Sequence, residues 1–518
     1  MTCFPAKGTS DPAKATPDLS PESLVVENET CWRIARADKL SVIVDAADFF
    51  RHAKDMMLQA RRSILLIGWD FDTRIRLVPD AKTRDHPDKL GRLFEHLSKR
   101  NPDLQIRILK WDVGLVHSIT RGETPLHMLR WMFSKRINLK LDRAHPAMAA
   151  HHMKLLVIDD AVAFCGGIDM TVGRWDTRDH MDDDQNRLSP YGRPEPPWHD
   201  ATSCFSGPAA KALGDLARAR WQTATGETLQ PVSATGPLWP KDLPADFNGI
   251  DIGIARTAPE YGEHRQVVEI ETATLAIIAA ARKTLYIESQ YFASRRIAEA
   301  MAKRLEEPDG PEIVIVNPMS ASGWLEEKTM DTARARLIKL VKAADRNGRF
   351  RIFYPVNHAG KEIYVHAKIM IADDRILKLG SANLNNRSMG YDTECDILVE
   401  AAEGGTADSR TILARRNDLI AEHLGQPAEA VEDTLERHGG SLIKTIAALN
   451  APAPGHRGLK PVEEREMGID DEWVAESDLV DPERPAGLRY RTSAYLRQRF
   501  GRRLFGRHSE KPIAEAKT

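Results

Sequence analysis

The sequence predicts an α/β protein made of two tandem domains related by a pseudo-two-fold. A short motif, His-x-Lys-x₄-Asp, occurs twice, at residues 152–159 and 366–373. A glycine turn follows each copy 14 residues after its His, at Gly166 and at Gly380. Apolar, strand-like runs alternate with amphipathic helical patterns ahead of both copies. We therefore expect each domain to contain a mixed, mostly parallel sheet flanked by helices.

The elements of the first half follow from its hydrophobic pattern. Residues 1–30 are polar and rich in proline, which predicts a disordered leader. An amphipathic helix is expected from Ser41, with apolar residues at helical spacing up to Met56. Further strands are predicted at Ser63–Phe71, Gln105–Asp112 and Ile137–Asp142, and further helices at Lys89–Lys99 and Thr124–Lys135.

The second half repeats this order after Ala255. Strands are predicted at Thr284–Phe292, Glu312–Pro318 and Phe350–Val356, and helices at Glu269–Arg282, Ser294–Glu306 and Glu326–Asp345. Trp69 lies 83 residues before His152, and Glu288 lies 78 residues before His366. A period of about 215 residues is far too long for a solenoid repeat. We expect a first domain over 31–255 and a second over 256–450.

The remaining residues, 451–518, form a linker and a tail. Residues 451–461 are rich in proline and glycine, and 463–481 are strongly acidic. Leu488–Arg507 carries seven Arg and no acid, with aromatic residues between them. This stretch is read either as an interfacial helix that binds anionic lipid or as a basic tail that packs on the acidic one. A predicted loop that holds Trp324 is a second candidate for membrane contact.

Composition limits the classes of function. The 518 residues carry a net charge of −2, so the chain lacks the basic footprint of a nucleic-acid-binding protein. The five cysteines are scattered and lack metal-site spacing, which favours reduced, buried thiols. There is neither an apolar run of membrane-spanning length nor a signal-peptide core. We expect a monomer in the cytoplasm or at the membrane periphery, with secretion by another route left open.

The repeated motif has the chemistry of a phosphodiester site. On a strand, His and Lys at positions i and i+2 point to the same face. Two halves that face each other would combine His152 and Lys154 with His366 and Lys368. Lysines can neutralise the non-bridging oxygens, while one imidazole attacks phosphorus and the other protonates the leaving oxygen.

Metal catalysis is the main alternative for such histidines. A lysine two residues from each His would repel a cation, and no HExxH motif or cysteine partner is present. We therefore expect neither a metal nor a cofactor. Asp159 and Asp373 complete the catalytic motif, although a strand end favours their holding loop and lysine geometry.

Both copies resemble the phospholipase D superfamily, over about residues 40–425. The stretches that resemble its two-motif, phospholipid-cleaving branch are GGIDMTVGRWDT (166–177), PWHD (197–200), YIESQYF (286–292), IYVHAK (363–368) and GSANLNNRSMGYDTE (380–394). The resemblance implies that His152 is the nucleophile, that His366 is the general acid and then the base, and that Lys154 and Lys368 bind phosphate.

The resemblance also implies supporting residues. Asn383 would contact the phosphate, and Asp169 occupies the equivalent position in the first copy. Glu394 would orient His366 and Asp200 would orient His152, although Asp176, Asp179 and 182–184 compete with Asp200. Glu288 and Gln290 would either line the pocket or fill the core.

The resemblance implies a metal-independent phospholipase D that acts on glycerophospholipids at a membrane surface. It would release phosphatidate and the head-group alcohol through a phosphohistidine, with water as the acceptor. A small alcohol could replace water, which makes a cardiolipin synthase-like phosphatidyltransferase the nearest alternative. A nuclease of the superfamily is disfavoured by the net charge, and a non-catalytic lipid-binding protein by two intact motifs.

Overall fold

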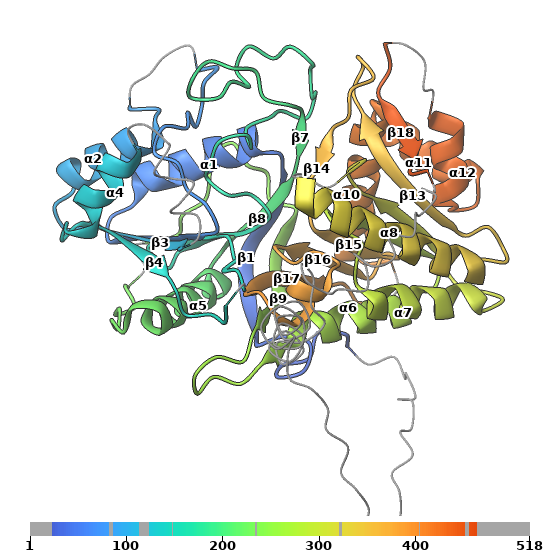
Figure 1. Cartoon of the computed structure of the whole chain (residues 1–518), viewed down its shortest axis with the longest axis horizontal. Helices are drawn as coiled ribbons and strands as arrows, with labels where there is room; N and C mark the ends of the chain where they lie inside the picture. Colours follow the sequence, from blue (N-terminus) through green and yellow to red (C-terminus); the bar gives the residue numbers. More distant parts are fainter. Residues whose placement is uncertain are drawn as a thin grey trace, which may run out of the picture.

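The computed structural model describes residues 23–81, 86–112, 124–147, 149–233, 236–320, 324–402, 405–450 and 455–463. The α/β class expected from the sequence is confirmed, with two halves joined by one large sheet (Figure 1). The expected acidic and basic tail lies outside the described residues, apart from its first position. No described helix is both long and apolar enough to cross a bilayer.

The first half contains eight strands and four helices among the described elements. They are β1 (Arg33–Val44), α1 (Ala46–Gln59), β2 (Ser63–Gly68), α2 (Leu90–Arg100), β3 (Gln105–Trp111), α4 (Thr124–Met132), β4 (Ile137–Asp142), β5 (Leu155–Ile158), β6 (Val162–Gly166), β7 (Trp198–His199), β8 (Ala201–Ser206) and α5 (Pro208–Thr225).

The second half repeats this order and adds helices at its end. Its elements are β9 (Phe247–Ala258), β10 (Val267–Val268), α6 (Glu269–Ala280), β11 (Thr284–Glu288), α7 (Arg295–Glu306), β12 (Glu312–Val316), α8 (Trp324–Ala344), β13 (Phe350–Val356), β14 (Tyr364–Val365), β15 (Ile369–Ala372), β16 (Ile376–Gly380), α9 (Asn386–Gly390), β17 (Glu394–Glu400), α10 (Ala407–Leu424), α11 (Ala428–Arg437), α12 (Leu442–Leu449) and β18 (Gly458–Pro461).

The main sheet has the same strand order in both halves, counted outward from its middle. The first half runs β1-β8-β6-β5-β2-β3-β4, and the second runs β9-β17-β16-β15-β11-β12-β13. Strands β1 and β9 pair antiparallel, so they join the halves around a pseudo-two-fold. The parallel pairs are β2–β3–β4 and β11–β12–β13; the strands nearer the middle pair antiparallel. Strand β18 covers the outer edge of β13.

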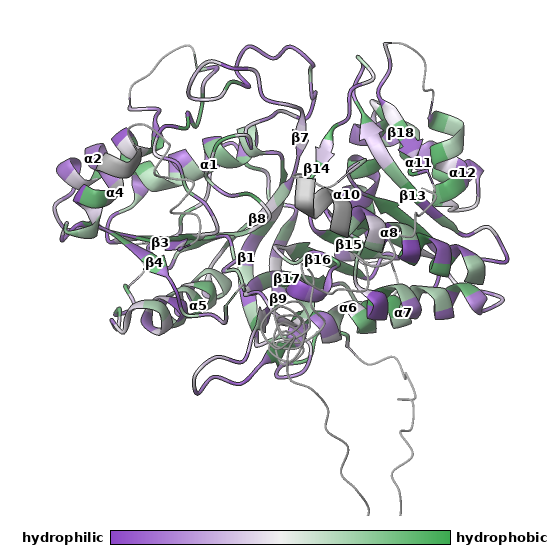
Figure 2. Ribbon diagram, in the orientation of Figure 1, coloured by the Kyte–Doolittle hydropathy of each residue, from purple (hydrophilic) through white to green (hydrophobic). Residues whose placement is uncertain are grey.

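The strands of the main sheet are apolar on both faces, because both faces are covered by other parts of the chain. Strand β2 reads SILLIG and buries its first five residues, as expected for a strand covered on both faces. Outer helices such as α5 and α7 combine hydrophilic and hydrophobic residues, while β15 and β16 are mostly hydrophobic (Figure 2). In α1, Phe49, Phe50, Ala53 and Met56 share the buried face at helical spacing.

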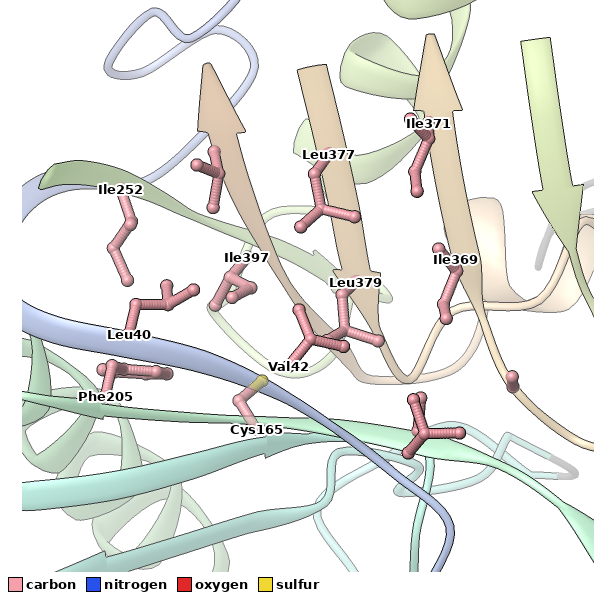
Figure 3. Packing of buried hydrophobic residues seen from close by; sticks show 14 of the residues in the cluster. Leu40, Val42, Cys165, Phe205, Ile252, Ile369, Ile371, Leu377, Leu379 and Ile397 are labelled. Carbon is pink, nitrogen blue, oxygen red and sulfur yellow. The ribbon is translucent and has the colours of Figure 1, made fainter. Parts of the chain in front are cut away.

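One hydrophobic core lies between the two halves. Leu40 and Phe205 of the first half belong to the same buried cluster as Ile252, Ile369 and Ile397 of the second (Figure 3). Two further cores lie on the other face of the sheet, one in each half. The halves are therefore fused through shared apolar packing as well as through the β1–β9 ladder.

The structure corrects several predicted boundaries. Residues 41–44 belong to β1, so the helix begins at Ala46 and not at Ser41. Strand β9 crosses the predicted boundary at 255/256, and the second repeat begins with Phe247. Strand β1 was missed because its first seven residues, RIARADK, carry four charged side chains and resemble a surface segment.

The two ends of the globular part are also more ordered than expected. In the predicted leader, Leu24 and Val25 are buried and their amides bind the Glu400 carboxylate. The predicted linker contains β18, which extends the sheet. Trp324 is the first residue of α8 and does not lie in a loop; its side chain is outside the described residues.

Candidate active site

The two motifs lie where the halves meet. His152 and Lys154 directly precede β5, which pairs antiparallel with β2. His366 and Lys368 have the same place before β15, which pairs with β11. Both motifs therefore lie beside the carboxyl ends of the parallel strands, where α/β proteins place their sites.

Each motif is hydrogen-bonded to the backbone of the other half. The His152 amide donates to the Thr393 carbonyl over 2.9 Å, and the His366 amide donates to the His199 carbonyl over 2.7 Å. Strands β7 and β14 add a parallel pairing between the halves just ahead of His366. These bonds bring two motifs 214 residues apart in sequence into one site.

The orienting carboxylates are exchanged relative to the sequence-based assignment. Nδ1 of His152 lies 3.0 Å from both carboxylate oxygens of Glu394, and Nδ1 of His366 lies 2.6 Å from Oδ2 of Asp200. Glu394 was expected to orient His366, and Asp200 to orient His152. The crossed backbone bonds explain the correction, because they place the start of β17 beside His152 and the end of β7 beside His366.

The two lysines have unequal surroundings. Nζ of Lys154 lies 3.2 Å from Oδ2 of Asp169, whose other oxygen accepts the Trp69 amide over 2.9 Å. In the second half, Asn383 replaces the acid. Nζ of Lys368 and Nδ2 of Asn383 each contact Oε1 of Gln290, at 3.4 and 3.5 Å. Lys154 is therefore neutralised locally, whereas the oxygens that hold Lys368 within the described part of the chain, those of Gln290 and of the His366 carbonyl, are neutral.

The amide of Asn383 is open to a ligand on one side. Its Oδ1 atom is buried and has no hydrogen-bond partner among the residues that the structure describes. Gln290, one of the residues for which a pocket and a core position were both expected, contacts both Lys368 and Asn383. Asp169 pairs with Lys154 and accepts an amide at the end of β2. These two contacts explain an acid at this position without a contact between Asp169 and the substrate.

Burial keeps the reacting groups close to neutrality. Burial, followed by the charges of Lys154 and Lys368, holds the pKa of His152 well below its usual value. The pKa of His366 is lowered well below its usual value by burial and then by Lys368. Burial also lowers the pKa of Lys368 to about 7 and raises that of Glu394 to about 8. Because each lysine affects the imidazole of the other half, the two motifs share one electrostatic environment.

Comparison with known proteins agrees with this geometry. A family model described as "Phospholipase D" matches residues 56–236, and one described as "Cardiolipin synthase, PLD-like domain" matches residues 274–408. The chain belongs to the phospholipase D superfamily. The two matches fall on the two halves and include both His-x-Lys motifs.

Relatives of this superfamily member share about a quarter of its residues. It is 24% identical to phospholipase D A of Dictyostelium discoideum and 23% identical to phospholipase D delta of Arabidopsis thaliana, each over 76% of this chain. It spans 36% and 64% of the lengths of those two relatives. A solved structure of phosphatidylserine synthase from Haemophilus influenzae has a similar fold, with a TM-score of 0.51 and 13% identity over 80% of this chain and 97% of that one.

The motif aspartates do not lie among the reacting groups of this phospholipase D-like site. Asp159 accepts the amides of Arg61, Arg62 and Ser63, each over 2.7 Å, and Asp373 accepts those of residues 282–284. Each lies at the far end of a four-residue strand from its lysine, five residues along an extended chain, a distance of about 16 Å. The structure therefore places Asp159 and Asp373 at the turns, as the strand-end position predicted, and brings neither carboxylate into contact with its motif lysine among the described residues.

A buried network of histidines and acids supports His366 from behind. Both ring nitrogens of His199 contact acids, Glu422 at 2.9 Å and Glu288 at 2.7 Å. His180 lies 2.9 Å from Asp176 and 3.3 Å from Glu422. His199 is the residue before Asp200, and its carbonyl accepts the His366 amide. The network thus fixes both the backbone and the carboxylate that hold His366.

The same network is the place where a metal ion could bind. Asp45, His180, His199 and Glu422 offer four buried ligand atoms within 4.8 Å of one another, and His199, Glu288 and His423 offer a second set. Hydrogen bonds already join most of these atoms to one another. Sequence reasoning missed the network as a whole, because its members come from five separate segments; Asp176, Glu288 and the PWHD stretch that contains His199 had been noted only one by one.

Proposed function

We propose that the protein is a phospholipase D-type phosphodiesterase that hydrolyses the head-group phosphodiester of glycerophospholipids. The observation that carries the proposal is the crossed arrangement, in which each motif His is oriented by a carboxylate of the other half. When the acid at Nδ1 is ionised, it accepts N–H from that side of the ring, so Nε2 of each ring is left for chemistry. Two such imidazoles and two lysines suit double displacement at phosphorus.

In the first step, Nε2 of His152 attacks phosphorus while Nε2–H of His366 gives its proton to the leaving alcohol oxygen. The P–O bond to the head group breaks and a P–N bond to His152 forms. Lys154 and Lys368 hold the non-bridging oxygens, and the Asn383 side chain faces them. A negative charge close to an imidazole raises its pKa. Binding of the anionic phosphodiester therefore favours protonation of His366, which the first step requires.

In the second step, water attacks the phosphohistidine. Neutral His366 takes the proton from water as the P–O bond forms, and the P–N bond breaks to release phosphatidate and free His152. The lysines remain in place, so the phosphate oxygens stay neutralised while the proton passes to His366. The proposed partners are the membrane surface and the acceptor, with the protein acting as a peripheral enzyme.

Phosphatidyl transfer is the second candidate. The match of residues 274–408 to a family model described for cardiolipin synthase favours it. In the proposed mechanism, an alcohol that reaches the phosphohistidine before water would be phosphatidylated by the same residues. The site residues are common to both outcomes, so the choice rests on which acceptor enters.

One experiment tests both candidates. Purified protein is incubated with mixed phospholipid vesicles, with and without a primary alcohol, and the phosphatidyl products are identified by mass spectrometry. Hydrolysis predicts phosphatidate, transfer predicts a phosphatidyl alcohol, and His152→Ala should abolish both. Absence of any phosphatidyl product, with cleavage of nucleic acid instead, would refute the proposal.

A further inference from the structure

Two buried thiols meet where the halves of the chain join. Cys165 lies on β6 and Cys395 lies on β17, and neither side chain is exposed to solvent. The Cys165 thiol is 3.7 Å from Sγ of Cys395 and 3.5 Å from the Cys395 carbonyl oxygen. Its sulfur points from the first half towards the strands of the second (Figure 3). A disulfide between them would need the two sulfurs to approach to about 2.05 Å.

The pseudo-two-fold shows that the fold itself does not require this pair. The residue equivalent to Cys165, directly before the glycine turn, is Leu379 in the second half. The residue equivalent to Cys395, directly after the orienting carboxylate, is Ala201 in the first half. Leu379 and Ala201 belong to the same core as the two cysteines. Apolar side chains therefore serve on one side of the axis where two thiols stand on the other.

Both cysteines are connected to the motif that contains His152. Cys395 directly follows Glu394, the carboxylate at Nδ1 of His152. Cys165 pairs with Leu155, the first residue after the His-x-Lys triplet. A bond between the sulfurs would therefore pull on the orienting carboxylate and on the strand that follows the motif. Because a misplacement of about 1 Å can cost about 100-fold in rate, a small shift of Glu394 is enough to slow attack by His152.

The surroundings of the pair decide which oxidant can reach it. The contact with Cys165, and then burial, hold the pKa of the Cys395 thiol well above its usual value. The thiolate is the reactive form, so oxidation is slow and requires a reagent small enough to enter the core. Cys31 and Cys204 are also buried free thiols, but each lies in a different core that contains no second described cysteine. Only Cys165 and Cys395 are placed to react with each other.

We propose that Cys165 and Cys395 are a redox modification site, at which hydrogen peroxide closes a disulfide between the two halves and thereby slows attack by His152. One thiol takes an oxygen atom from the peroxide and becomes a sulfenic acid, with release of one water. The other thiol attacks that sulfur, so that the S–S bond forms, the S–O bond breaks and a second water leaves with the thiol proton. Two thiols and one peroxide thus give one disulfide and two waters. A dithiol reductant reverses the change by exchange.

The test has one readout for the bond and one for its effect. The full chain is treated with hydrogen peroxide, unfolded with iodoacetamide to block free thiols, and digested without reduction, and the linked peptides are identified by mass spectrometry. The burst of nitrophenol from a phosphatidyl-nitrophenol is measured before the treatment, after it, and after dithiothreitol. The mapping is independent of activity, whereas the burst rests on the proposed function.

Two variants make the comparison specific. The double variant Cys165→Leu/Cys395→Ala removes both thiols and copies the pair that the second half already carries at these positions, so it should fold. Cys204→Ala is the matched control, because it removes a buried thiol from a neighbouring strand and keeps the pair.

Peroxide should link the Cys165 peptide to the Cys395 peptide and slow the burst about tenfold or more in the wild type and in Cys204→Ala, and dithiothreitol should restore it. The burst of the double variant should stay the same throughout. Absence of the linked peptide would overturn the inference, and so would a linked peptide with an unchanged burst, or equal slowing in the double variant. If the reduced wild type gives no burst at all, the proposed function fails, while the peptide map still decides whether the two thiols join.

Discussion

The crossed carboxylates make a prediction that distinguishes the two half-reactions. Removing the charge of Glu394 should impair attack by His152, whereas removing that of Asp200 should impair proton transfer by His366. We therefore compare Glu394→Gln with Asp200→Asn on two phosphatidyl esters, one with a nitrophenol leaving group and one with an alkyl alcohol. A nitrophenolate leaves without a proton, so its release does not depend on the general acid.

The expected size follows from the contacts. Each substitution replaces an ionic acceptor at 2.6–3.0 Å from a buried imidazole with a neutral amide. A hydrogen bond to a charged group contributes about 1.5–3 kcal/mol, which corresponds to roughly 10- to 150-fold in rate. Because burial raises the pKa of Glu394 to about 8 and lowers that of Lys368 to about 7, the comparison is made at pH 7, 8 and 9, so that ionisation of the carboxylate is separated from loss of the lysine charge.

The assay is the burst of nitrophenol that accompanies formation of the phosphatidyl-enzyme. Glu394→Gln should slow the burst by the full factor, while Asp200→Asn should leave it nearly unchanged and slow turnover of the alkyl ester. Thr393→Val is the control, because Thr393 holds the neighbouring His151 at 2.7 Å outside the reacting set. A burst that is lost in Asp200→Asn and kept in Glu394→Gln would refute the role of His152 as the nucleophile.

Four further outcomes are expected. Turnover should persist in excess chelator; complete loss that one divalent ion restores would instead indicate a required metal, with the His199 network as the first place to search. The burst rate should pass through a maximum near pH 7–8, because Glu394 ionises with a pKa of about 8 while Lys368, which holds the phosphate, loses its proton with a pKa of about 7; Glu394→Gln should remove the rising limb and keep the falling one. Asp159→Asn should lower the free energy of unfolding by about 1–3 kcal/mol, measured by urea denaturation, yet leave kcat almost unchanged; a large loss of kcat in folded protein would restore its catalytic role. Truncation after Pro482 should weaken binding to anionic vesicles in a sedimentation assay without changing turnover of short-chain lipid, unless the tail packs on the catalytic halves.

The sequence predicted the features that local patterns encode. The repeated His-x-Lys spacing located both motifs, and apolar runs located strands such as β2 and β12 to within a few residues. Asp159 and Asp373 were correctly expected at strand ends, where a carboxylate can accept several amides. These features depend on residues close in sequence, so a single chain is enough to predict them.

The sequence did not predict the features that depend on contacts between the two halves. Which carboxylate serves which imidazole is decided by the amide bonds of His152 and His366 to the opposite half. The His199 network joins residues up to 244 positions from one another, such as Arg178 and Glu422. No periodicity in the sequence predicts contacts between residues so far apart along the chain.

The exchange of carboxylates has a consequence for the history of this chain. A single ancestral half would have carried His, Lys and a carboxylate, yet its acid would have pointed away from its own imidazole. Such a half could act only after pairing with a second copy through the strand that is now β1 or β9. Gene fusion would have turned an obligatory homodimer into one chain and freed its halves to diverge, as Asp169 and Asn383 have done. Co-expressed separate halves should therefore complement each other, while either one alone stays inert.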